Sequence, residues 1–126
     1  MSAQSAAHEH SRRWHDYRTA GGNRPVRDFL HVLNPTDARA ILAEMEVVRR
    51  RGLAAARHLR GDIWEVRVAS SGNAYRILFA AEGRFSQILL ALEAFQKTTQ
   101  RTPPAAIEVA ERRLADWRQR GRERED

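Results

Sequence analysis

The chain has 126 residues and no cysteine, which excludes disulfide bonds and thiolate metal sites. This length fits one domain, because a typical domain holds about 100–200 residues. All but one of its 22 lysines and arginines are arginine, its net charge is +6 and its sequence pI is near 11.1. A pI above about 9 is typical of nucleic-acid-binding domains, and the planar arginine side chain binds phosphate through two donors at once. The alternative is a codon bias towards arginine combined with an ordinary solvated surface.

The first half of the chain predicts one short strand and two helices. Residues 1–11 show no periodicity and are expected to be disordered. Residues 13–17 form the expected strand. Residues 24–33 and 36–51 carry apolar side chains at helical spacing, and Gly52 ends the second helix.

Three consecutive arginines, residues 49–51, close the second of these helices. Cations there suit the negative end of the helix dipole, so they need no further explanation. Contact with RNA is the alternative, and the sequence leaves both open.

The middle of the chain changes from a helical to an alternating pattern. Residues 63–69, 74–80 and 87–95 predict three consecutive antiparallel strands, the last of them apolar enough to be covered on both faces. Alternation puts Trp64, Val66 and Val68 on one face of the first strand and Ile63, Glu65 and Arg67 on the other. In the second strand, one face carries Tyr75, Ile77 and Phe79, and the other face carries Arg76 and Leu78.

A last helix is expected to begin after Thr102, whose hydroxyl can cap it, and to run to about Arg118. Residues 12–118 are the expected domain, and residues 119–126 are a mixed-charge tail that is expected to fray. No apolar run approaches the roughly 20 residues that a membrane-spanning helix needs, and no secretion signal precedes the domain. A cytoplasmic protein without a membrane partner is expected.

Two arginines are predicted to face each other across the sheet. If residues 70–73 form the first hairpin loop, Ala69 pairs with Ala74, and Arg67 then lies opposite Arg76. Like charges in that position destabilise a sheet by tenths of a kcal/mol, unless an anion lies between them. A bound phosphate would turn the repulsion into two charge-assisted contacts, whereas Glu65 could neutralise the pair in an ordinary surface network.

Cleavage of RNA by its own 2′-hydroxyl requires positive charge on the phosphate and groups that move protons. Arginine and lysine serve the first need, and Glu65 and Glu93 are the candidate bases. Counting through a tight second turn at Glu82-Gly83 puts Arg76 opposite about Leu89, so Lys97 would lie more than ~20 Å further along the strand.

Three blocks resemble HigB-type toxins of the RelE/ParE superfamily, which include phage-derived members. They are residues 59–67 (LRGDIWEVR), 75–79 (YRILF) and 95–103 (FQKTTQRTP), and they occur in the family's order and spacing. The resemblance implies an α+β fold, in which a small, mainly antiparallel sheet packs against N-terminal helices and a C-terminal helix follows. It also implies metal-independent cleavage of mRNA on the ribosome by 2′-hydroxyl attack, without a cofactor.

The expected partners follow from the same resemblance. They are a HigA-like helix-turn-helix antitoxin, mRNA on the ribosome, and operator DNA only through the antitoxin complex.

The site that the resemblance implies includes Arg67, Arg76 and Lys97 as catalytic residues, together with Glu93. Arg60, Tyr75 and Arg101 in the same blocks are the expected RNA contacts, and no metal ligand is expected. Two positions depart from the family pattern: Thr98 replaces a second lysine, and Glu93 stands where many relatives have histidine.

The sequence leaves two further functions open. One is inhibition of DNA gyrase by a ParE-like chain that shares the fold but lacks the nuclease site. The other is RNA binding without catalysis.

Overall fold

The computed structural model describes residues 11–125, with the side chains of 123–125 left out. The expectation of disorder for residues 1–11 therefore falls almost entirely outside the described residues. The elements, in chain order, are β1 (Arg13–Asp16), α2 (Pro25–Val32), α3 (Pro35–Arg51), a 3-10 helix η1 (Gly52–Ala55), β2 (Arg57–Arg60), β3 (Ile63–Ser70), β4 (Asn73–Glu82), β5 (Ile88–Gln96) and α4 (Pro104–Glu125).

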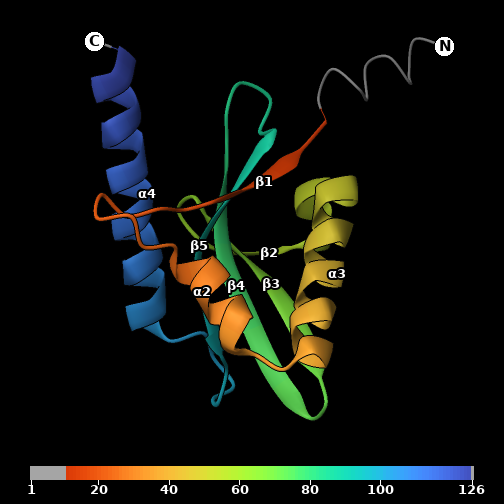
Figure 1. Cartoon of the computed structure of the whole chain (residues 1–126). Coiled ribbons are helices and arrows are strands. Elements are labelled where there is room, and N and C mark those ends of the chain that lie inside the picture. Colours follow the sequence, from red (N-terminus) through yellow and green to blue (C-terminus); the bar gives the residue numbers. More distant parts are fainter. Residues whose placement is uncertain (1–10, 126) are drawn as a thin grey trace, which may run out of the picture.

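Over the described residues, the five strands form one sheet in the order β1-β5-β4-β3-β2. β1 runs parallel to β5, and the other neighbours are antiparallel. Helices α2 and α3 cover one face of this sheet and α4 covers the other (Figure 1). The predicted α+β fold, with a mainly antiparallel sheet between N-terminal helices and a C-terminal helix, is confirmed. None of the described helices is long and apolar enough to cross a membrane.

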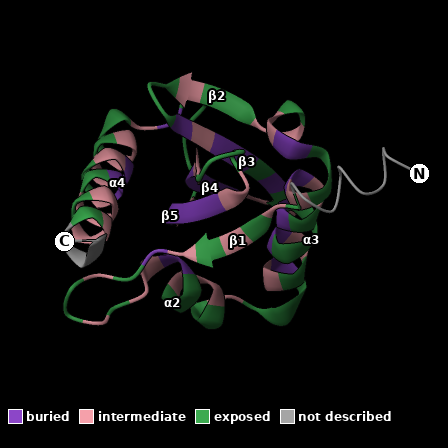
Figure 2. Ribbon diagram, turned by 90° about the horizontal axis from the view of Figure 1, so that it is seen from above, coloured by how far each residue is buried: buried purple, intermediate pink, exposed green. Residues whose placement is uncertain are grey.

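The two faces of the sheet carry separate apolar clusters, and the strands between them are the most buried part of the molecule (Figure 2). The cluster under α2 and α3 contains Val66, Tyr75 and Ile77. The cluster under α4 contains Ile63 and Leu78. This division is the alternation predicted for β3 and β4, so Glu65, Arg67 and Arg76 share the face of α4.

The first hairpin has the predicted register, since Ala69 pairs with Ala74 and Arg67 with Arg76. Its turn is shorter than expected because Ser70 and Asn73 also pair, which leaves two residues in the turn. Ser71 and Gly72 have φ of 54° and 78°, the positive values that such a turn requires. A tight turn of this kind fixes the register of both strands.

The second hairpin differs from the prediction, and the difference moves Lys97. β4 extends to Glu82, which pairs with Ile88 across a loop of residues 83–87, and a bulge interrupts the pairing after Leu78. Arg76 therefore pairs with Phe95 rather than with Leu89. The expected separation of Lys97 from Arg76 is wrong, because the backbone N–H of Lys97 donates to the carbonyl oxygen of Ala74 at 2.7 Å.

Further differences concern an edge strand and the two ends of the last helix. β2 was not predicted, since it is a four-residue edge strand with three exposed polar residues. The last helix begins at Pro104 and extends past Arg118 to Glu125. Arg118 itself pairs with Glu82 at 2.7 Å and with Asp62 at 3.0 Å, which holds this part of α4 on the sheet.

A buried carboxylate joins α3 to the first hairpin. Asp37 accepts hydrogen bonds from the hydroxyls of Ser70 (2.6 Å) and Tyr75 (2.5 Å) and from the amide of Asn73 (3.2 Å). The bonds from Ser70 and then Tyr75 are the main reason why the pKa of Asp37 lies well below its ordinary value of 3.8. The charged form is thus favoured by folding.

Replacing Asp37 with asparagine is expected to lower the melting temperature by several degrees at neutral pH, because an amide cannot accept all three bonds. The folded pKa is depressed, so this stabilisation is complete above pH 3.8 and is lost as the pH falls below that value. Thermal unfolding followed by circular dichroism should therefore show a gap between wild type and Asp37→Asn that narrows in acid. A gap of constant size from neutral pH to pH 3 would contradict the role of the charge.

Candidate active site

A buried glutamate lies at the centre of the polar end of the sheet. The side chain of Glu65 is fully buried on the face that α4 covers. Its Oε1 accepts from Nε of Arg67 at 2.8 Å, and its Oε2 accepts from the hydroxyl of Thr102 at 2.6 Å. Nε of Arg76 lies 3.8 Å from the same Oε2. One carboxylate thus separates the two facing arginines.

The two arginines differ in what they offer to a ligand. The side chain of Arg67 is 44% exposed, whereas that of Arg76 is 10% exposed. Nη1 of Arg76 donates to the carbonyl of Tyr75 at 2.9 Å, but its buried Nε has no hydrogen-bond partner among the described residues. Arg76 therefore keeps an unused donor, and a buried donor without a partner costs about 1–3 kcal/mol.

The loop between β5 and α4 has hydrogen bonds of its own and is joined to the Glu65 cluster at its C-terminal end. Nζ of Lys97 donates to the carbonyl of Gln100, and the hydroxyl of Thr99 donates to that of Arg101 at 2.8 Å. Thr102, at the other end, holds Glu65. Thr102 was expected to cap α4, but its hydroxyl donates a hydrogen bond to the carboxylate of Glu65 instead.

Lys97 is the lysine of this loop, and its surroundings favour loss of its proton. Burial lowers its pKa from the ordinary value of 10.5, and the charges of Arg76 and Arg57 lower it further. Glu65 acts in the opposite direction but more weakly than the first two causes. An ammonium group among arginines is thus easier to deprotonate than a free lysine.

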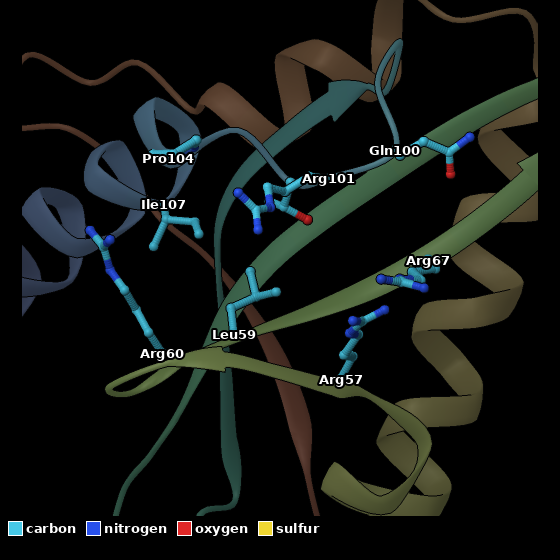
Figure 3. A pocket seen from close by; sticks show the side chains of 9 residues that line it. Arg57, Leu59, Arg60, Arg67, Gln100, Arg101, Pro104 and Ile107 are labelled. Atoms are coloured by element: carbon cyan, nitrogen blue, oxygen red, sulfur yellow. The ribbon is translucent and has the colours of Figure 1, made fainter.

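A pocket of about 570 Å³ opens beside the Glu65 cluster. Four arginines line it: Arg57 and Arg60 from β2, Arg67 from β3, and Arg101 from the loop. In Figure 3 the side chains of Arg57 and Arg67 point towards each other, Arg101 points to the side of Leu59 and Ile107, and Arg60 lies along α4. Arg60 pairs with Glu111 at 2.7 Å. Neither Arg57 nor Arg101 has an ion pair with a described carboxylate, so the pocket is electrostatically prepared for anions.

Three residues expected at the site line this pocket, and two others adjoin it. Arg60, Arg67 and Arg101 are in its wall. Arg76 lies behind Arg67 at Glu65, and the charge of Lys97 is coupled to that of Arg76.

The structure puts Glu93 and Tyr75 elsewhere. Glu93 accepts from Arg113 of α4 at 3.1 Å and from the N–H of Ala94, so it holds α4 on the sheet. Tyr75 is 2% exposed on the opposite face, where its hydroxyl binds Asp37. A side chain buried there offers no surface for a base to stack on.

Sequence reasoning missed Arg57, Gln100 and Thr102. Arg57 belongs to the unpredicted strand β2, where it pairs in register with Glu65. Gln100 lines the pocket from the loop. The signal that could have found Thr102 is its place in the same block as Lys97 and Arg101. Among the described side chains, no three of histidine, aspartate or glutamate gather closely enough to hold a metal ion.

Comparison with known proteins gives two results. The family model of Phage derived protein Gp49-like matches residues 28–115, which include the sheet from β2 to β5 and most of α4. Two curated sequences of Mycobacterium tuberculosis, from strains CDC 1551 / Oshkosh and ATCC 25618 / H37Rv, are each named "Probable endoribonuclease HigB1". Each is 33% identical over 108 residues, which cover 83% of this chain and 84% of the relative. These matches confirm the resemblance that the three sequence blocks indicate.

Proposed function

Because the chain belongs to the phage-derived Gp49-like family and is HigB-like, we propose that it is an endoribonuclease, the toxin of a toxin–antitoxin pair. Its substrate is mRNA on the ribosome, in the cytoplasm. Its inhibitor is a HigA-like helix-turn-helix protein, through which alone it would meet operator DNA. The observation that carries the proposal is the pocket of four arginines beside the Arg67–Arg76 pair.

The chemistry that this arrangement supports is transfer of the phosphodiester to the neighbouring 2′-hydroxyl. The 2′-oxygen forms a bond to phosphorus and loses its proton, while the bond to the 5′-oxygen breaks and that oxygen gains a proton. In the transition state, negative charge builds up on the phosphoryl oxygens. Fixed donors stabilise this charge more strongly in the transition state than in the ground state. Arg67, exposed in the pocket, supplies donors at that place, and Arg76, which is 10% exposed behind it, adds a second positive charge.

Glu65 has a supporting role in this mechanism. A carboxylate without exposed surface and held by Arg67 and Thr102 does not reach a substrate proton. It keeps two like charges side by side, so that both face the same phosphate. Proton transfer is left to Lys97, whose pKa is lowered by burial and by the neighbouring arginines.

The function is tested by inducing the protein in bacteria and mapping a known transcript by primer extension. Cuts within codons that require ribosomes support the nuclease, and Arg67→Ala should weaken them. Intact mRNA together with gyrase-dependent DNA breaks would instead indicate a gyrase inhibitor. Intact mRNA and DNA would indicate an RNA-binding protein without catalysis.

The lowered pKa of Lys97 predicts how cleavage depends on pH. The protonated form supplies the charge and the proton, so cleavage should decline as the pH rises through a value below 10.5. In Lys97→Arg the cation persists, and the decline should move to higher pH even if the maximal rate falls. Cleavage of ribosome-bound mRNA as the pH is raised measures both profiles. Coincident alkaline declines in the two proteins would contradict the assignment of Lys97.

A further inference from the structure

The arginines that close α3 are not equivalent. Nε and Nη2 of Arg49 donate to Glu46 at 2.8 and 2.6 Å, and Arg50 lies 3.7 Å from the same carboxylate. Arg51 is exposed and has no ion pair with a described residue. One role open to Arg51 is that of a cation at the negative, C-terminal end of α3.

Another arginine already serves the end of this helix. Nη1 of Arg12 donates to the carbonyls of Arg49 and Arg50, at 3.1 and 3.3 Å. These are among the last carbonyls of α3, which lack partners within the helix. The helix therefore has a cation at its negative end without Arg51. Helix chemistry accounts for Arg49 and Arg50 through Glu46 and leaves Arg51 unexplained.

Arg51 lines a second hollow of about 410 Å³. Three consecutive alanines, residues 54–56, lie on its wall, so short side chains leave it open. Arg57 and Arg67 line this hollow and also line the pocket of four arginines. The two hollows are thus adjacent and meet at a pair of guanidinium groups. In Figure 3, Arg57 and Arg67 point towards each other at this boundary.

We propose that the second hollow is a subsite for a nucleotide that flanks the cleaved phosphodiester, with Arg51 bound to its phosphate. The proposal rests on the proposed function, because it assigns a further contact to the same RNA strand. Arg57 and Arg67 hold the phosphate between the two hollows, and Arg51 holds the next one beyond. The volume is within the range of small-ligand sites, which is about 300–1,000 Å³. Glu44 on the same wall supplies an acceptor for a ribose hydroxyl or a base amino group.

The test measures binding of RNA that cannot be cut. RNAs with a 2′-methoxy group on every ribose lack the attacking hydroxyl, so binding is separated from catalysis. We expect a trinucleotide to occupy mainly the pocket of four arginines, which has more cations on its wall, whereas a nonanucleotide can also reach the second hollow. Fluorescence anisotropy at low salt should show about tenfold tighter binding of the longer RNA. Arg51→Ala should remove most of that gain, about fivefold in affinity, and change trinucleotide binding by less than about twofold.

Arg39→Ala is the matched control. Arg39 is an exposed arginine of the same helix, without an ion pair to a described residue, and it lines neither hollow. Its loss changes the net charge equally but should weaken neither RNA by more than about twofold. Equal losses in the two variants, or equal affinity of wild type for the two lengths, would overturn the proposal. If the gain depends on Arg51 but ribosomal mRNA is never cut, the subsite stands and the proposed nuclease function fails.

Discussion

Replacing Arg76 with alanine is expected to abolish mRNA cleavage, with a loss of about a thousandfold or more in rate, while the protein stays folded. The reason is the position of its guanidinium. It is 10% exposed, so little water screens its charge, and its Nε has no partner among the described residues. A cation fixed in this way stabilises the negative charge that increases on the phosphoryl oxygens during the reaction.

The fold should tolerate the loss of Arg76 for a specific reason. Arg67 and Arg76 are opposite each other in the sheet, and removing one relieves a like-charge repulsion. Glu65 keeps Arg67 and Thr102 as partners. Circular dichroism of Arg76→Ala should therefore show the fold of wild type, while its melting temperature should fall because Glu65 loses a buried partner.

A suitable control is Arg118→Ala, since Arg118 is a half-buried, ion-paired arginine outside the site. Its loss should lower stability and leave the cleavage rate of the folded protein within about threefold of wild type. Full growth arrest by a soluble, folded Arg76→Ala variant would refute the site assignment.

The sequence was sufficient to predict those features of the site that depend on local geometry, namely the faces of the strands and the register of the first hairpin. Alternation assigned Glu65, Arg67 and Arg76 to one face, and the tight turn at Ser71 and Gly72 set their register. Such a turn leaves few alternatives, because only some residues accept positive φ. The same alternation places Tyr75 on the opposite face, where the structure has it.

The sequence was insufficient where two distant irregularities combine. The loop of residues 83–87 and the bulge after Leu78 move the partner of Arg76 from Leu89 to Phe95. Both shifts are determined by packing of the whole sheet, and a one-residue shift changes which face a side chain occupies. Thr102 illustrates the same limit: its partner Glu65 is 37 residues away, whereas the capping rule looks only at its neighbours.

Glu65 explains why this sheet accepts two facing arginines. Its carboxylate is fully buried and binds Arg67 and Thr102, with Arg76 in ion-pair range. Removing one partner from a buried ionic group is far more destabilising than replacing the whole group by apolar residues. Glu65 therefore neutralises the two arginines before a phosphate binds, and it holds them in the position in which they can bind one.

Glu65→Gln is accordingly expected to destabilise the protein by about 3 kcal/mol, as removal of one partner of a buried ionic cluster does. The amide retains the size of the side chain and an acceptor for Thr102, so the loss reports the charge. Urea unfolding gives the free energy of unfolding. Thr102→Val, which removes one hydrogen bond and retains the shape, should cost only about 1 kcal/mol.

A second readout separates this cluster from a merely structural ion pair. Without the carboxylate, Arg67 and Arg76 are left as two adjacent cations, and an added anion can take its place. Inorganic phosphate should therefore raise the melting temperature of Glu65→Gln by more than it raises that of wild type. The matched comparison is Glu111→Gln, which frees the exposed Arg60 alone and should respond to phosphate as wild type does. An equal response of all three proteins would mean that the two arginines do not form a common anion site.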